Sequence, residues 1–113
     1  MKQTFYNFCP LCDKMILSFK QEMQRRNFYD ERLLLNWRYI FNDFADKIAP
    51  LKIIFNGIDN NGVVKKILYV ATFDRRIATE FLFYKQRLLD DLNTYFGIDK
   101  SIYVDLKIKL INQ

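Results

Sequence analysis

Residues 64–110 decide the fold and read VKKILYVATFDRRIATEFLFYKQRLLDDLNTYFGIDKSIYVDLKIKL. The first eight of these residues are rich in β-branched and aromatic side chains, which predicts a strand. Asp74 is a suitable N-cap and Gly97 a suitable C′ residue, so a long helix is expected between them. Residues 102–110 alternate apolar and polar side chains, which predicts a second strand. Two strands joined through a helix are expected to be parallel neighbours, with a right-handed crossover.

Side-chain periodicity predicts which faces of these elements are buried. The apolar stripe of the helix is expected to contain Ile77, Ala78, Phe81, Leu82, Leu88, Leu89, Leu92, Tyr95 and Phe96. In the last strand, the buried side chains are expected to be Ile102, Val104, Leu106, Ile108 and Leu110. The opposite face of that strand would then present Tyr103, Asp105, Lys107 and Lys109.

The preceding half of the chain predicts two helices and one more strand. Apolar residues recur at helical spacing over residues 10–26 and again over residues 31–48. Pro50 is expected to end the second helix, because a residue before proline avoids the α region. Residues 51–56 alternate as a half-buried strand, and the Asn- and Gly-rich residues 56–62 are a turn that joins it to the next strand.

These elements predict an α+β domain with the order α-α-β-β-α-β. A small sheet of about three strands would carry helices on one face. The whole chain, residues 1–113, is expected to be one domain, with a helical part at about 10–48 and the remaining elements at about 51–110. The shared core is predicted to contain Trp37, Phe41, Leu68, Val70, Phe81, Leu92 and Leu106.

Composition excludes several classes of protein. Of the 113 residues, 50% are hydrophobic and 17% aromatic, which is far from the composition of a disordered chain. The net charge is +5, which permits a polyanionic partner and also suits an ordinary soluble surface. We find no apolar run long enough for a membrane span and no secretory signal, so a cytoplasmic protein that does not engage the membrane is expected.

Catalytic motifs are missing from the sequence. The chain has no His, so His-based acid–base catalysis and Ser-His triads are excluded. Its three Gly do not form a phosphate-binding loop. We therefore expect no enzyme activity, no cofactor and no small-molecule substrate.

Cys9 and Cys12 form a C-x-x-C motif at a predicted helix start. A zinc site needs further ligands, and the chain offers no other Cys and no His. A thioredoxin-like site would follow a strand, and none is predicted before Cys9. We expect neither a bound metal nor a catalytic disulfide.

Basic residues are the functional signal that the sequence offers. Tyr103 is predicted to lie with Lys107 and Lys109 on the outward face of the last strand, where an aromatic ring among ammonium groups suits base stacking and phosphate contact. The full candidate set for nucleic-acid binding is Lys52, Lys65, Arg75, Arg76, Tyr103, Lys107 and Lys109. A solvated face with scattered charges explains the same pattern equally well, because Asp105 interrupts the row.

The order of landmarks resembles the DciA-type family, bacterial loaders of the replicative helicase. That family shows a Trp-x-x-x-(Val/Ile)-Gly helix, a Pro before the first strand, a Leu-x-Val strand, an acidic-apolar pair in the next helix and a Leu-Leu-x-x-Leu-Asn-x-x-Leu-Gly segment. The matching residues here are Trp37 to Asn42, Pro50, Leu68 to Val70, Glu80-Phe81 and Leu88 to Gly97. The resemblance covers about residues 30–110. The pair Phe41-Asn42 departs from it, since it stands where the family has Val/Ile-Gly.

The resemblance implies a K-homology type II-like fold and a non-enzymatic function. Its implied partners are the replicative helicase and DNA. The few lysines beside Tyr103, interrupted by Asp105, predict that single-stranded DNA is bound weakly and without sequence specificity. Two alternatives stay open at this point. One is a K-homology-like module that binds RNA, although the G-x-x-G loop of such modules is missing. The other is a protein-interaction domain with no role in nucleic-acid binding.

Overall fold

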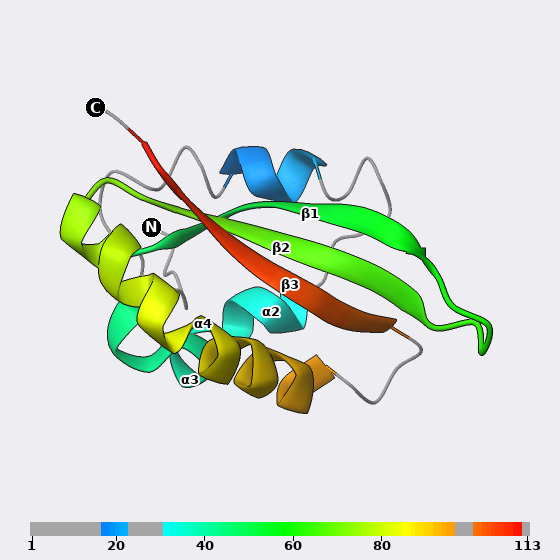
Figure 1. Cartoon of the computed structure of the whole chain (residues 1–113). Helices are drawn as coiled ribbons and strands as arrows, with labels where there is room; N and C mark the ends of the chain where they lie inside the picture. The colour runs from blue at the N-terminus through cyan, green and yellow to red at the C-terminus, as the bar shows by residue number, and fades with distance from the viewer. Residues whose placement is uncertain (1–16, 23–30, 97–100, 112–113) are drawn as a thin grey trace.

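The fold is α+β, as predicted, with a three-stranded mixed sheet. It is seen in a computed structural model that describes residues 17–22, 31–96 and 101–111 (Figure 1). Figure 1 shows α2 (Glu31–Leu35), α3 (Trp37–Phe41) and α4 (Arg75–Phe96) together on one side of this sheet. Among the described elements, no helix is long and apolar enough to cross a membrane.

The sheet contains β1 (Ala49–Ile58), β2 (Val64–Thr72) and β3 (Ser101–Leu110), in that spatial order. β1 and β2 form an antiparallel hairpin, and β2 and β3 are parallel. The parallel pairing confirms the expectation drawn from the intervening helix. Within β1 and β2, the buried Ile53 and Leu68 are direct partners, so both strands direct the same face toward the core.

Asp59 organises the turn of the hairpin. Its Oδ1 accepts hydrogen bonds from the backbone N–H groups of Asn61 (2.8 Å) and Val63 (2.9 Å). Gly62 follows with φ of 81°, a conformation that favours glycine. The turn is shorter than the predicted 56–62 segment, because β1 continues to Ile58 before the chain reverses.

The predicted single helix over residues 31–48 is wrong. The chain forms α2, a break at Asn36, α3 and then a 3₁₀ turn, η2 (Asn42–Phe44), and β1 has already begun at Ala49. Asparagine side chains compete for backbone hydrogen bonds and so favour non-helical conformations. The apolar spacing that suggested one helix is preserved, because Leu34 and Trp37 are buried on either side of the break.

Asn42 has an unusual backbone conformation, with φ of 51° and ψ of −117°. These angles approximate the mirror image of the first central position of a type II turn, which is a position that favours glycine. A non-glycine residue held in such a region costs about 1–3 kcal/mol. The cost is offset here by the burial of the adjacent Phe41, which is fully shielded from solvent.

Replacing Asn42 by Gly is therefore expected to stabilise the protein by about 1 kcal/mol, because glycine relieves the strain but adds chain entropy to the unfolded state. Urea unfolding followed by circular dichroism measures the change. The matched control is Asn36→Gly, at a position with an ordinary φ of −104°, where glycine should destabilise. A destabilising Asn42→Gly would contradict the assignment of strain to this residue.

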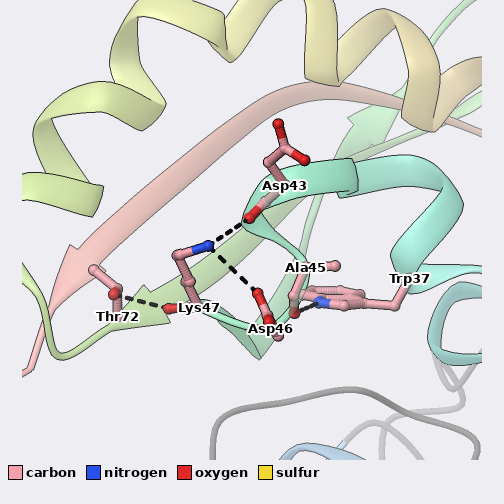
Figure 2. A network of polar contacts seen from close by, with 6 residues as sticks. All are labelled: Trp37, Asp43, Ala45, Asp46, Lys47 and Thr72. Carbon is pink, nitrogen blue, oxygen red and sulfur yellow. Dashed lines mark hydrogen bonds and ion pairs between the residues drawn. The ribbon is translucent and has the colours of Figure 1, made fainter.

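Hydrogen bonds fix the connection from η2 to β1 (Figure 2). The indole Nε1–H of Trp37 donates to the carbonyl of Ala45 at 3.0 Å, and the hydroxyl of Thr72 donates to the carbonyl of Lys47 at 2.9 Å. Lys47 Nζ donates to the carbonyl of Asp43 at 3.0 Å. The turn between η2 and β1 is thus tied to α3 by Trp37 and to the end of β2 by Thr72.

The long helix α4 begins as predicted. Oδ1 of Asp74 accepts a hydrogen bond from the backbone N–H of Arg76 at 2.8 Å, which is the expected N-cap contact. Among the members of the predicted apolar stripe whose side chains the structure describes, Leu82 is wrong, because it is 61% exposed. The predictions for the side chains of Tyr95 and Phe96 stay predictions. Leu82 follows the buried Phe81 by one position and is therefore rotated about 100° away from it.

All seven predicted core residues are buried, which confirms that prediction. They share one cluster with others, among which are Phe19, Leu33, Leu34, Ile40, Ile48, Ile53, Leu88 and Tyr103. Phe19 belongs to a helical segment at residues 17–22, the described part of the helix predicted for residues 10–26. Cys9, Cys12 and Gly97 lie outside the described residues, so the predictions made for them stay predictions.

Candidate nucleic-acid interface

The sheet face opposite the core carries a row of side chains across all three strands. Lys52 of β1 and Lys107 of β3 are both register partners of Tyr69 in the central strand. Tyr69 lies between the fully buried Leu68 and Val70, so alternation turns its ring to the opposite face. We call the part of this surface with exposed or half-buried side chains the open sheet face; its members are Lys52, Ile54, Lys65, Ile67, Tyr69, Lys107 and Lys109. The register partners Ala49 and Ala71, at the end of the sheet beside Lys109, are buried.

Tyr69 is the aromatic residue of this face. Its ring is half-buried, and Lys52 Nζ lies 5.0 Å from the ring centroid. The neighbouring pair of Ile54 and Ile67 is also half-buried and extends the apolar surface beside the ring. An aromatic ring on an apolar base, bordered by ammonium groups, can stack a nucleobase while the ammonium groups contact phosphates.

The predicted place of Tyr103 on this face is wrong. Tyr103 is 1% exposed and belongs to the core, whereas Ile102 and Val104, which were expected to be buried, are partly exposed. The reason is a register irregularity, since Lys66 pairs with Tyr103 but Ile67 pairs with Asp105. Val104 is the extra residue of a β-bulge, and such a residue reverses the in–out alternation on one side of it.

Asn93 of α4 holds this bulge in place. Its Nδ2 donates to the carbonyl of Tyr103 at 2.8 Å, and its Oδ1 accepts from the backbone N–H of Tyr103 at 2.9 Å. Below the sheet, Lys66 Nζ lies 4.4 Å from the centroid of the Tyr103 ring. The alternation downstream of the bulge places Leu106 in the core and leaves Lys107 and Lys109 exposed, as predicted for these three residues.

Asp105 is paired with two lysines. Its carboxylate lies 2.9 Å from Lys85 Nζ on α4 and 3.6 Å from Lys107 Nζ. The hydrogen bond from Lys85 is the main cause that holds the pKa of the Asp105 carboxyl below its usual value, against the opposing effect of desolvation. The negative charge of Asp105 is therefore largely compensated from α4, and it reduces the positive potential of the open sheet face less than the sequence implied.

The other predicted site residues lie at the two ends of this face. Lys65 pairs with Ile102 near the hairpin, and Lys109 pairs with Ala71 at the opposite end. Arg75 and Arg76 begin α4 shortly after β2 ends, so they lie near the Lys109 end of the sheet. Both arginines are exposed, but no register pairing places them in the Lys52–Tyr69–Lys107 row. Apart from Tyr103, which lies in the core, the predicted set thus divides into four lysines on the sheet face and a separate pair of arginines on α4.

A cavity of about 340 Å³ lies on the helical side, between η2 and α4. Its lining combines carboxylates from Asp43 and Glu80 with cations from Lys47 and Arg87 over an aromatic floor that contains Phe44. Such mixed charge does not select a polyanion. Within the part of the chain that the structure describes, no cluster of three or more potential metal ligands occurs.

Comparisons of the chain with protein-family models, with curated proteins and with solved structures found no match.

Proposed function

We propose that the protein is a non-enzymatic cytoplasmic domain that binds single-stranded DNA on its open sheet face and assists a replicative helicase. The observation that carries the DNA-binding part is the row of Lys52, Tyr69 and Lys107 across the three strands, with Lys52 Nζ 5.0 Å from the Tyr69 ring. In this proposal a base stacks on Tyr69, and the flanking lysines neutralise the phosphates on either side. No atom of the contact reads a base edge, so binding is independent of sequence.

The charge of the face sets its expected affinity. Four lysines contribute, and one of them, Lys107, is shared with Asp105. With roughly −0.7 per neutralised phosphate on a single strand, we expect a slope of log affinity against log salt of about −2 to −3. Binding should fall in the weak, non-specific range of about 10⁻⁴–10⁻⁶ M.

Substitutions on the open sheet face test this proposal. Tyr69→Leu should weaken binding to a labelled oligothymidine about tenfold, because a stacking contact is worth about 1–3 kcal/mol, whereas Tyr69→Phe should retain it. Fluorescence anisotropy at several salt concentrations measures both the affinity and the slope. Tyr39→Ala is the matched control, since Tyr39 is an exposed aromatic residue of α3. If Tyr39→Ala and Tyr69→Leu lose affinity for the oligothymidine equally, the proposal that DNA binds on the open sheet face is contradicted.

Removing the carboxylate of Asp105 should have the opposite effect. Asp105→Asn leaves Lys107 without its acidic neighbour, so single-stranded DNA should bind about threefold more tightly, with a salt slope more negative by up to about 0.7. The same anisotropy titration provides the measurement. Asp46→Asn is the control, because this substitution also removes one negative charge but lies beside η2, where Asp46 pairs with Lys47. An equal gain in both variants would indicate a net-charge effect without a local site.

Two local structures support the resemblance from which the helicase partner is inferred. Asn42 occupies the position where the DciA-type pattern has Gly, and its φ of 51° is a conformation that favours glycine. Asn93, the asparagine of the Leu-Leu-x-x-Leu-Asn segment, makes two hydrogen bonds to β3. A backbone conformation that favours glycine at position 42, and an asparagine that bridges α4 and β3 at position 93, would explain why the pattern has Gly and Asn at these places.

The helicase partner and the type of nucleic acid need their own tests. Purified replicative helicase should be retained by the immobilised protein in the absence of DNA. No retention, with single-stranded DNA binding intact, would leave a DNA-binding module without the loading role. A clear preference for RNA over DNA of the same sequence would favour the alternative of a K-homology-like RNA-binding module.

A further inference from the structure

The outer side of α4 presents an exposed apolar centre. The buried line of this helix contains Ile77, Phe81, Leu88 and Leu92. Directly opposite lies Phe83, which is 83% exposed, with the exposed Leu82 and Tyr84 on either side of it. A large aromatic side chain with this exposure, on the side of a helix that faces away from the sheet, is a typical centre of a protein–protein contact.

Charges are arranged symmetrically in sequence around Phe83. Arg76 lies seven residues before it and Asp90 seven residues after it, and all three are exposed on the same side of α4. Arg76 lies in the first turn, where the helix dipole disfavours cations. Among the described residues, no ion pair involves the side chain of Arg76 or that of Asp90.

This arrangement is complementary to itself. If a second copy of α4 is placed antiparallel, with a two-fold axis beside Phe83, then Arg76 lies opposite the partner's Asp90. The two-fold axis repeats this pair, so two opposite-charge pairs flank a centre formed by both copies of Phe83. The negative end of the partner's helix also lies near Arg76, which compensates its unfavourable position in α4.

We propose that the protein forms a two-fold symmetric dimer through the outer side of α4. A basic residue before Phe83 and an acidic residue after it match each other when two copies of α4 run antiparallel. This arrangement favours a second copy of the chain, because contact with an unrelated partner does not require opposite charges at equal distances from Phe83. The contact leaves the open sheet face free, so each copy of the chain retains its own Lys52–Tyr69–Lys107 row. One helix from each copy forms a small interface, for which we expect a dissociation constant in about the micromolar range.

Sedimentation velocity of the full chain over a range of concentrations at low salt tests the dimer. The wild type should shift from monomer to dimer, and Phe83→Glu should be monomeric throughout. Arg76→Glu and Asp90→Lys should each weaken the dimer at least about tenfold, because each places like charges opposite one another twice. Lys109→Glu, an equal charge change on the sheet, is the matched control and should dimerise like the wild type.

Mixing the two charge variants is the decisive step. In a mixed dimer, Glu at position 76 meets Lys at position 90, and the wild-type Asp90 of one chain meets the wild-type Arg76 of the other. The mixture should therefore dimerise about as well as the wild type, although neither variant does so alone. A monomeric wild type at several hundred micromolar, a dimer that is insensitive to Phe83→Glu, or a mixture that stays monomeric would each overturn the proposal.

Discussion

Replacing Trp37 by Ala is expected to lower the free energy of unfolding by about 3–5 kcal/mol. The indole is 1% exposed, its ring centroid lies 4.5 Å from that of Phe41, and its Nε1–H donates to the carbonyl of Ala45. The substitution removes the largest side chain of the core and leaves the Ala45 carbonyl without this donor. Urea unfolding followed by circular dichroism measures the loss.

Trp37→Phe separates the two contributions. Phenylalanine retains most of the apolar volume but cannot donate to the Ala45 carbonyl, so a smaller loss of about 1–2 kcal/mol is expected, from the hydrogen bond and the reduced ring. An unfolding midpoint that does not change in Trp37→Ala would be inconsistent with a buried indole and would restore Trp37 as an anchor for a partner.

Replacing Asn93 by Ala is expected to cost about 2–3 kcal/mol. The two hydrogen bonds between the Asn93 amide and the backbone of Tyr103 are lost together, and both backbone groups lie in a partly buried position. Because these bonds hold the β-bulge, the variant should also alter the packing of Tyr103 in the core. Urea unfolding measures the stability, and the near-ultraviolet spectrum reports on the tyrosine.

Asn93→Asp is the matched variant for this site. Aspartate can still accept from the Tyr103 N–H but cannot donate to its carbonyl, so its stability should lie between that of the wild type and that of Asn93→Ala. If Asn93→Ala leaves the free energy of unfolding unchanged, then the bulge is maintained by strand pairing alone.

The sequence predicted best those elements whose pattern lies within one short stretch of the chain. The cap at Asp74 and the 3.6-residue spacing of Ile77, Phe81, Leu88 and Leu92 are properties of one helix, and α4 forms where they indicate. The apolar spacing from Leu34 to Ile48 also located a buried stripe. It failed to show that the helix breaks, because apolar spacing reports which side chains are buried and not the backbone conformation of Asn36 and Asn42 between them.

The candidate site was only partly predictable, because a long-range contact determines it. Strict alternation placed Tyr103 beside Lys107, but the bulge at Val104 moves Tyr103 to the core. The amide that holds the bulge comes from α4, and alternation within one strand contains no information about it. Tyr69 was missed because its role depends on the register of β2 against both neighbours. The predicted burial of Leu68 and Val70 was the signal that could have placed Tyr69, which lies between them, on the opposite face.

Nuclear magnetic resonance mapping of a single-stranded oligonucleotide on the labelled protein tests the central claim most directly. We expect the amide signals of Lys52, Tyr69 and Lys107 to shift with added oligonucleotide, and these shifts to diminish as salt is raised. Signals from the outer side of α4 around Phe83 should stay in place. Shifts confined to α4 and the cavity beside η2, with the three central residues unchanged, would contradict the assignment of nucleic-acid binding to the open sheet face.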